Sequence, residues 1–262
     1  MNLPYDEDTL REMELWPFLE LRRQSLMPSV EPAPQADVAV PAPPRAPARP
    51  SSPSRTATPA AAIRVSADPA RAARIAQLDW NGLKTEAAAC QACGLYKQRK
   101  QAVLGVGALD APWLFIGEGP GAEEDDAGEP FVGPAGKLLD AMLAAAGLQR
   151  GREVYIANVV KCRPPGNRNP SAEEALACAP LLDRQIDLIQ PKLIVALGKI
   201  ALTRLTGSEA SMASMRGKLH EYRGIPVVAT YHPAYLLRNL PDKLKAWEDL
   251  IFAKRAFVAN AG

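Results

Sequence analysis

The sequence contains few of the residues on which several classes of protein depend. Its 262 residues include only four cysteines and two histidines, and four cysteines are too few for a small secreted fold held together by disulfides. No run of about 18 uncharged apolar residues is present, so we expect no membrane-spanning helix. The first residues also lack the basic and apolar regions of a signal peptide. Together these absences predict a protein of the reducing cytoplasm.

Glycine is absent before Gly82, whereas ten of the 25 prolines lie between Pro28 and Pro59. Residues 28–69 consist mainly of proline, alanine and serine, with few large apolar side chains. Such a segment cannot bury enough apolar area to offset the conformational entropy that folding costs. We predict a disordered linker here, partly in the polyproline II conformation, and a folded domain in residues 70–262.

Residues 1–27 differ from the linker because they carry a cluster of leucine, methionine and aromatic side chains, interrupted by Pro17. The apolar spacing predicts one or two helical turns on each side of that proline. Two interpretations stay open for this short apolar helical segment. It packs on its own domain, or its residues 9–26 form a docking peptide for a partner protein.

Apolar runs and helical patterns alternate from residue 70 onward. This alternation predicts an α/β fold in which helices cover both faces of a mainly parallel, four-stranded sheet. The expected strands are residues 112–118, 153–160, 192–198 and 225–232, and the expected helices are residues 71–89, 134–146, 171–190, 199–205 and 242–257. Ligands bind in such folds beyond the carboxyl ends of the strands. A site is therefore expected where strands end, at residues 117–125, 158–170 and 230–238.

All four cysteines fall within 89 consecutive positions. Cys90 and Cys93 have two residues between them, a spacing at which both thiols bind one metal centre. Cys162 lies in an expected loop and Cys178 in an expected helix. A thioredoxin-like redox pair would follow a strand, whereas Cys90 follows a helix. The spacing is compatible with a tetrahedral zinc ion, an iron–sulfur cluster, or buried thiols unrelated to one another.

A glycine-rich loop, Gly117-Glu118-Gly119-Pro120-Gly121, follows the first expected strand. It lacks both the GxGxxG order of dinucleotide-binding loops and the Gly-Lys-Ser/Thr of P-loops. Five carboxylates follow within residues 123–129, and they would repel a pyrophosphate. This loop is therefore not expected to bind a nucleotide phosphate.

In combination, several short motifs resemble those of the family-4 uracil-DNA glycosylases, the iron–sulfur branch of that superfamily. The motifs are GEGPG followed by PFVGPAGKLLD, then NVVKCRPPGNRNP and YHPAYLL, together with the cysteines. The resemblance covers roughly residues 83–257. It implies a three-layer αβα sandwich and a monofunctional hydrolase of DNA base-excision repair that removes uracil and leaves an abasic site. It also implies a structural [4Fe-4S] cluster held by Cys90, Cys93, Cys162 and Cys178.

Three residues suit uracil excision. Uracil offers an O4 acceptor and an N3–H donor where cytosine offers a donor and an acceptor, and the side-chain amide of Asn158 can read that difference. Phe131, in a glycine–proline loop, is suited to stack on a flipped base. His232 is the expected donor to uracil O2, where negative charge builds as the glycosidic bond breaks.

The backbone around Glu118 and Gly119 is expected to lie close to the base and sugar. Elsewhere in the superfamily this motif carries an aspartate that orients the attacking water, and here Gly119 stands in its place. Glu118 is the expected substitute, acting through water.

Contacts with DNA must be local, because the chain has a net charge of only +2. We expect phosphate contacts from basic residues that follow the second strand or the first cysteine pair: Lys161, Arg163 and Arg168, and Lys97, Arg99 and Lys100. Leu237 and Arg238 are expected to fill the gap that an extruded base leaves.

The predicted protein is a nucleoid-associated, cytoplasmic monomer that binds uracil-containing DNA. Two alternatives stay open. A protein of the same fold would excise another deaminated base, such as hypoxanthine or xanthine. A non-catalytic iron–sulfur protein would bind DNA as an accessory module.

Overall fold

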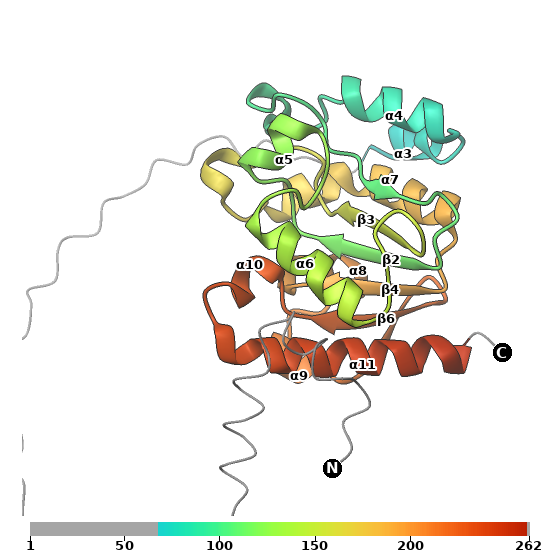
Figure 1. The fold of residues 1–262 in the computed structure, drawn as a ribbon. Coiled ribbons are helices and arrows are strands. Elements are labelled where there is room, and N and C mark those ends of the chain that lie inside the picture. Colours follow the sequence, from blue (N-terminus) through green and yellow to red (C-terminus); the bar gives the residue numbers. More distant parts are fainter. Residues whose placement is uncertain (1–67, 261–262) are drawn as a thin grey trace, which may run out of the picture.

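The computed structural model describes residues 68–260 of the chain (Figure 1). The interpretations of residues 1–27 as an apolar helical segment and of residues 28–67 as a linker lie outside the described residues. The described part begins with Asp68, whose carboxylate accepts hydrogen bonds from the amides of Ala70 and Arg71. Asp68 thereby caps the first helix, which starts at Pro69. Asp68 and Pro69, which were expected to belong to the linker, are therefore part of the start of this helix.

A six-stranded sheet forms the centre of the described region, with the strand order β1-β3-β2-β4-β6-β5. The four expected strands are present, and all of their pairings with one another are parallel. The sheet is larger than the predicted four strands because a short antiparallel strand adds to each edge. Neither edge strand is a buried apolar run, so no such signal marks them. The strands are β1 (Val106–Gly107), β2 (Trp113–Gly117), β3 (Val154–Asn158), β4 (Leu193–Leu197), β5 (Leu219–Tyr222) and β6 (Ile225–Thr230).

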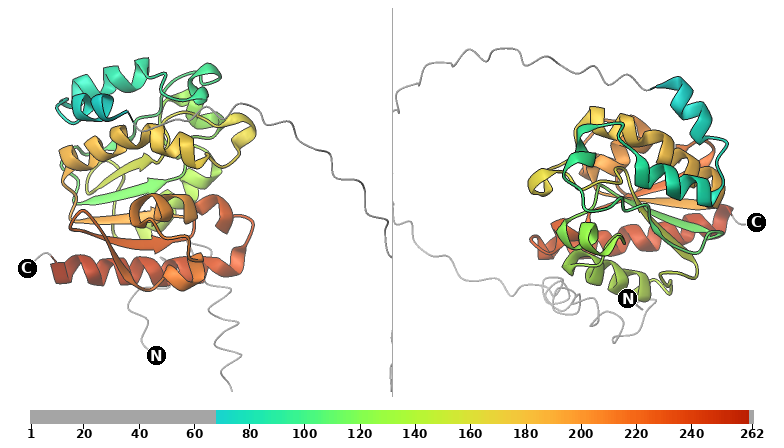
Figure 2. Two further views of the ribbon diagram at one scale, coloured as in Figure 1. Left: turned by 180° about the vertical axis from the view of Figure 1, so that it is seen from behind. Right: turned by 90° about the horizontal axis from the view of Figure 1, so that it is seen from above.

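Helices cover both faces of the sheet, as Figure 1 and the turned views in Figure 2 show. Successive residues of a strand point to opposite faces. Leu114 and Ile116 of β2 accordingly belong to the apolar core beneath α3, α4, α7 and α8. Trp113 and Phe115 belong to the second core, beneath α6 and α11. The expected three-layer αβα architecture is therefore confirmed.

The expected helices are present, except that the first of them is divided in two, and several short helices that were not expected lie between them. The expected helix of residues 71–89 is two helices, because Asp79 starts a second one by accepting a hydrogen bond from the amide of Gly82. Ser171 and Glu174 form the predicted capping box.

No described helix is both long and apolar enough to cross a membrane. The α-helices are α3 (Pro69–Ile75), α4 (Trp80–Ala89), α5 (Ala122–Ala127), α6 (Pro134–Ala145), α7 (Ala172–Ile189), α8 (Lys199–Thr206), α9 (Met212–Met215), α10 (Pro233–Leu236) and α11 (Lys243–Asn260); the 3-10 helices are η1 (Gly94–Lys97), η2 (Pro165–Asn167) and η3 (Leu240–Asp242).

The carboxyl ends of the parallel strands meet at one edge of the sheet. Gly117, the last residue of β2, pairs in register with Asn158, the last residue of β3. His232 follows β6 by two residues. The three segments that the sequence singled out therefore leave the sheet at the same edge.

Candidate active site

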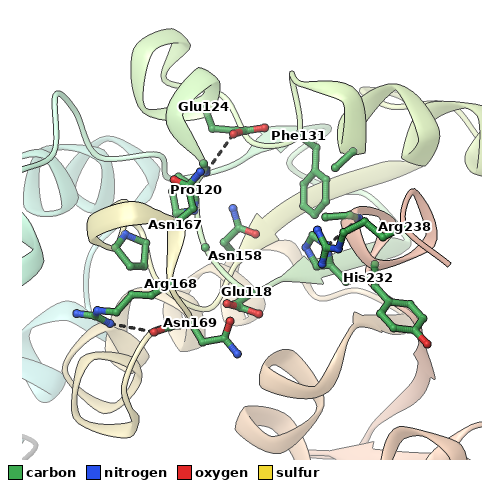
Figure 3. Close-up of a pocket in the computed structure, with 16 residues that line it drawn as sticks. Glu118, Pro120, Glu124, Phe131, Asn158, Asn167, Arg168, Asn169, His232 and Arg238 are labelled. Atoms are coloured by element: carbon green, nitrogen blue, oxygen red, sulfur yellow. Dashed lines mark hydrogen bonds between the residues drawn. The ribbon is translucent and has the colours of Figure 1, made fainter.

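A pocket opens at this edge of the sheet (Figure 3). It contains about 1090 Å³ of space not filled by atoms, its open mouth included. Its walls come from the loop after β2, the loop after β3 and the segment around α10. The structure thus brings together Glu118, Gly119, Phe131, Asn158, Arg168, His232 and Arg238, all of which the sequence had singled out. Leu237 lies beside the pocket and is exposed.

Asn158 lies at the base of the pocket, at the end of β3, with only 1% of its surface exposed. Its side-chain oxygen is buried and has no hydrogen-bond partner within the described region. A Cβ atom at Gly117 would lie 2.4 Å from this oxygen and 2.7 Å from the ring of Phe131. Glycine at position 117 therefore lets both side chains approach the strand. A buried acceptor without a partner is costly, and this one is available for a donor on a ligand.

The aromatic ring of Phe131 lies beside the imidazole of His232. The ring centroids are 5.4 Å apart and the planes are inclined by 29°. Figure 3 shows the two rings side by side, with the Asn158 amide and the Glu118 carboxylate facing the same opening. Phe131 is buried and has a φ angle of +56°, in the left-handed region that non-glycine residues seldom adopt. The ring forms one wall of a slot that could accept a flat ligand.

The hydrogen bond at His232 Nδ1 decides which nitrogen of its imidazole carries the proton. Its Nδ1 accepts a hydrogen bond from the backbone amide of Ala234 at 3.1 Å, where His232 caps the start of α10. Burial, assisted by the positive charge of Arg238, lowers the pKa of His232 to about 4. Since Nδ1 is the acceptor, the proton of the neutral ring is on Nε2. His232 can therefore donate one hydrogen bond to a ligand without carrying charge.

Glu118 places a partly buried carboxylate in the pocket. Burial raises the pKa of this carboxyl above its usual value. Next to it, a Cβ atom at Gly119 would lie 2.7 Å from Cγ2 of Val160. An aspartate does not fit at position 119 unless Val160 moves. Glu118, one residue earlier, brings a carboxylate into the pocket, whereas Gly119 has no side chain.

Glu124 is a structural element of the pocket whose role the sequence did not reveal. Its carboxylate accepts hydrogen bonds from the amides of Gly121, Val132 and Gly133. These amides belong to the two loops that enclose the pocket from the side of β2. Glu124 therefore ties the glycine-rich loop to the loop of Phe131. Its position in a run of acidic residues gave no indication of this role.

Lys161 does not lie at the surface, and the prediction of a phosphate contact there is wrong. The side chain is 1% exposed, and its Nζ donates to the backbone carbonyl of Asn158 at 2.7 Å. Burial lowers the pKa of Lys161 to about 8, although nearby Cys178 and Asp183 oppose that shift. A buried ammonium engaged in this way cannot reach DNA. Its place is behind the pocket, between Asn158 and the cysteines.

The four cysteines line one apolar hollow with about 280 Å³ of space not filled by atoms. Cys90 and Cys93 come from the segment between α4 and η1, Cys162 from the loop after β3, and Cys178 from α7. No disulfide links any of the four cysteines. Burial raises the pKa of Cys178 to about 12 and also raises those of Cys93 and Cys162. The structure thus brings together the four cysteines that the resemblance assigned to one cluster.

Hydrogen-bond donors point at these sulfur atoms. Arg71 donates to Cys90 at 3.3 Å, Arg99 to Cys162 at 2.9 Å, and the backbone amide of Lys161 to Cys178 at 3.3 Å. Arg99 was expected at a phosphate, but its guanidinium is engaged with Cys162 and with the carbonyl of Ala88. Donors of this kind stabilise thiolates. Among residues 68–260, no group of three or more His, Cys, Asp or Glu side chains is arranged to hold a single metal ion.

Four of the other residues that were expected to contact DNA lie in or beside the loops that line the pocket. Lys97 lies in η1, and Lys100 forms an ion pair with Asp126. Arg168 is exposed and forms an ion pair with Glu174 at 2.7 Å. Arg163 donates through Nε to the side chain of Asn167. Leu237 is 42% exposed and directly precedes Arg238, which lines the pocket. These four residues stay candidates for contacts with DNA.

Comparisons with known proteins agree with this arrangement. The family model described as "Uracil DNA glycosylase superfamily" matches residues 104–251. The type-4 uracil-DNA glycosylase of Thermotoga maritima is 46% identical over 177 residues, which cover 66% of this chain and 91% of that protein. The enzyme of the same name from Pyrobaculum aerophilum is 48% identical over 158 residues, covering 57% of this chain and 80% of that protein. A type-4 enzyme of Sulfurisphaera tokodaii is 45% identical over 176 residues, 64% of this chain and 79% of that protein.

Proposed function

The chain belongs to the uracil DNA glycosylase superfamily, and we propose that it removes uracil from DNA by hydrolysing the N-glycosidic bond. The product is DNA with an abasic site, and the reaction belongs to base-excision repair. The names of the similar type-4 enzymes support this activity. The observation in this chain that carries the proposal is the buried, unpartnered side-chain oxygen of Asn158.

That oxygen fits the edge of uracil. A uracil base in the slot beside Phe131 would present its N3–H to the Asn158 oxygen and its O4 to the Asn158 NH2. Cytosine would present an acceptor to the oxygen and a donor to the NH2, so both contacts would be repulsive. A buried polar group discriminates strongly in this way because the wrong partner leaves it unsatisfied. The side-chain amide of Asn158 is thus suited to bind uracil and to reject cytosine.

His232 supports departure of the base. Negative charge develops on uracil O2 as the bond to the sugar breaks. The Nε2–H of His232 is fixed by the hydrogen bond at Nδ1 and is available to that oxygen. The low pKa of about 4 keeps the ring neutral, so uracil leaves as an anion stabilised by a hydrogen bond and needs no proton from the ring.

Glu118 is the group that supports the attack of water. Its carboxylate lies in the pocket, and burial raises its pKa. A carboxylate of higher pKa holds a proton more strongly and is a better base towards water. It also supplies negative charge near the sugar, where the transition state is positive.

Cys90, Cys93, Cys162 and Cys178 would hold a structural [4Fe-4S] cluster. Four thiols around one hollow, with Arg71 and Arg99 donating to two of the sulfurs, fit a multi-atom anionic centre better than one ion. When bound, the cluster would cross-link the segment after α4, the loop after β3 and α7. The cluster would thereby support the backbone from which Asn158 and Lys161 project.

Arg163, Arg168 and Arg238 are the proposed DNA contacts, with Leu237 as the side chain that enters the duplex in place of the flipped base. Arg168 has donors in excess of the two that Glu174 accepts, so its ion pair does not prevent a contact with phosphate. The low net charge of the chain makes these local contacts necessary.

Oligonucleotides that carry one uracil, hypoxanthine, xanthine or cytosine test the proposal. The full-length protein is expected to release free uracil and to leave an alkali-labile abasic site, with no release of cytosine. Release of hypoxanthine or xanthine without uracil would assign the site to another deaminated base. Binding of DNA without release of any base would instead favour the accessory-protein alternative.

A further inference from the structure

Arg150 lies outside the pocket yet contacts the backbone of the loop that forms its aromatic wall. It follows α6 by five residues and forms an isolated bridge with Val154 of β3. Its Nη1 donates to the carbonyl of Pro130 at 2.8 Å, and its Nη2 donates to the carbonyl of Phe131 at 2.9 Å. One planar guanidinium therefore binds two successive peptide groups about 20 positions earlier in the chain.

These two peptide groups are the ones on either side of the Phe131 Cα atom. Fixing both of them fixes the φ and ψ angles of Phe131, which are the only soft backbone torsions of that residue. The φ angle of Phe131 is +56°, and an L-residue with a side chain is disfavoured there. The torsions decide whether the ring points at His232 or away from it. A clamp on both carbonyls therefore acts directly on the wall of the pocket.

The surroundings of Arg150 keep the clamp in place. Its Nε donates to the carboxylate of Asp140 on α6 at 2.8 Å, so three nitrogen atoms of the guanidinium are engaged. The first turn of α6 also presses on the same loop, because a Cβ atom at Gly136 would lie 1.8 Å from the Phe131 carbonyl oxygen. The guanidinium fork matches two carbonyl acceptors, and a lysine ammonium does not.

We propose that Arg150 is a positioning residue for uracil excision, which holds Phe131 in its left-handed backbone conformation so that the ring forms the base-stacking wall. The inference rests on the proposed function. Arg150 has no contact with the bound base in this account and acts only through Phe131. Without the clamp, the loop samples conformations in which the ring leaves the slot, and affinity for the base falls with the population of the competent state.

The experiment compares full-length wild type, Arg150→Met, Phe131→Ala and the double variant on a single-stranded oligonucleotide with one uracil. Inhibition by free uracil is measured beside kcat and KM, because uracil alone probes the slot without the phosphate contacts. Arg150→Lys is the conservative variant. Arg152→Met is the matched control, since Arg152 lies in the same loop, is exposed, and its side chain forms an ion pair with Glu153. Thermal unfolding of each variant is followed in parallel.

Arg150→Met is expected to weaken inhibition by uracil about ten-fold and to lower kcat by a similar factor, with KM for DNA changed less than about two-fold. In the Phe131→Ala background the same substitution is expected to change inhibition by less than about two-fold, because no ring remains to be positioned. Arg150→Lys is expected to fall between wild type and Arg150→Met, and Arg152→Met to match wild type.

An equal loss on substituting Arg150 in both backgrounds would overturn the inference, as would unchanged inhibition by uracil with a lowered unfolding temperature. If Arg150→Met does not fold, the double-mutant cycle is repeated with Arg150→Lys in the wild-type and Phe131→Ala backgrounds. The coupling measured in that cycle then decides between these results. If wild type releases no uracil at all, the proposed function fails and this inference with it. If wild type is active and the cycle shows no coupling, only the role of Arg150 is lost.

Discussion

The ammonium group of Lys161 lies 2.7 Å from the backbone carbonyl oxygen of Asn158 and donates a hydrogen bond to it in the interior of the protein. The backbone amide of the same lysine donates to the sulfur of Cys178. One residue thus joins the end of β3, which carries Asn158, to the cysteine-lined hollow. The pocket and the hollow are two sides of one short segment of chain.

Lys161→Met is expected to lower the excision rate about ten-fold, because the peptide of Asn158 loses the charge-assisted hydrogen bond that fixes it. Lys192→Met is the control, since Lys192 is exposed at the start of β4, away from the pocket. The measurement is single-turnover excision with enzyme in excess. A rate equal to that of wild type would show that the bond does not position Asn158.

His232 should make the stability of the protein depend on pH in the acidic range. Its pKa is lowered from 6.5 to about 4 in the folded state. Below pH 6.5 the unfolded chain therefore takes up a proton that the folded chain excludes, and stability falls as the pH falls. From pH 7 to pH 5 this single group should remove about 2 kcal/mol.

Urea unfolding of wild type and His232→Gln at pH 7 and pH 5 measures this contribution. Between pH 7 and pH 5, the free energy of unfolding of the variant should fall by about 2 kcal/mol less than that of wild type. Identical losses would show that the imidazole is not held neutral. The excision rate of wild type should correspondingly show no inflection near pH 6.5.

The cysteine-lined hollow predicts the metal content of the purified protein. Iron and acid-labile sulfide should each be present at about four per chain, with the brown colour of a [4Fe-4S] cluster. Cys178→Ser should lose iron and unfold at a lower temperature, because one of the attachments between α7 and the loop after β3 is gone. A colourless preparation with one zinc per chain would contradict the assignment.

A chain that starts at Asp68 is expected to retain excision of uracil from short oligonucleotides. The described residues that line the pocket and the hollow lie after this position, and Asp68 itself caps α3. The comparison uses equal concentrations of the full-length and shortened proteins. Loss of activity in the shortened chain would show that the first 67 residues belong to the enzyme.

The sequence predicted the strands of the sheet interior well because each is a continuous apolar run that is buried on both faces. The edge strands β1 and β5 escaped prediction because they are short and only half buried. The division of the first helix depends on one local hydrogen bond of Asp79, which residue type alone does not reveal.

The pocket was predicted at the correct edge of the sheet because its segments follow strands. Lys161 and Arg99 were misjudged for one reason. A basic residue in a loop is usually solvated. The sequence does not show that Lys161 donates to a buried carbonyl or that Arg99 donates to a thiol. The clamp of Arg150 on Phe131 joins positions 19 residues apart through backbone carbonyls. Backbone acceptors leave no signal in residue type.

The most direct test is release of uracil by wild type and by Asn158→Ala, with Asn81→Ala on the exposed face of α4 as the control. Wild type and the control should release uracil at the same rate. Asn158→Ala should be slower by at least about 100-fold, because the group that reads N3–H and O4 is gone, while DNA affinity stays within about three-fold, set by phosphate contacts. Excision by Asn158→Ala at the wild-type rate would contradict the account.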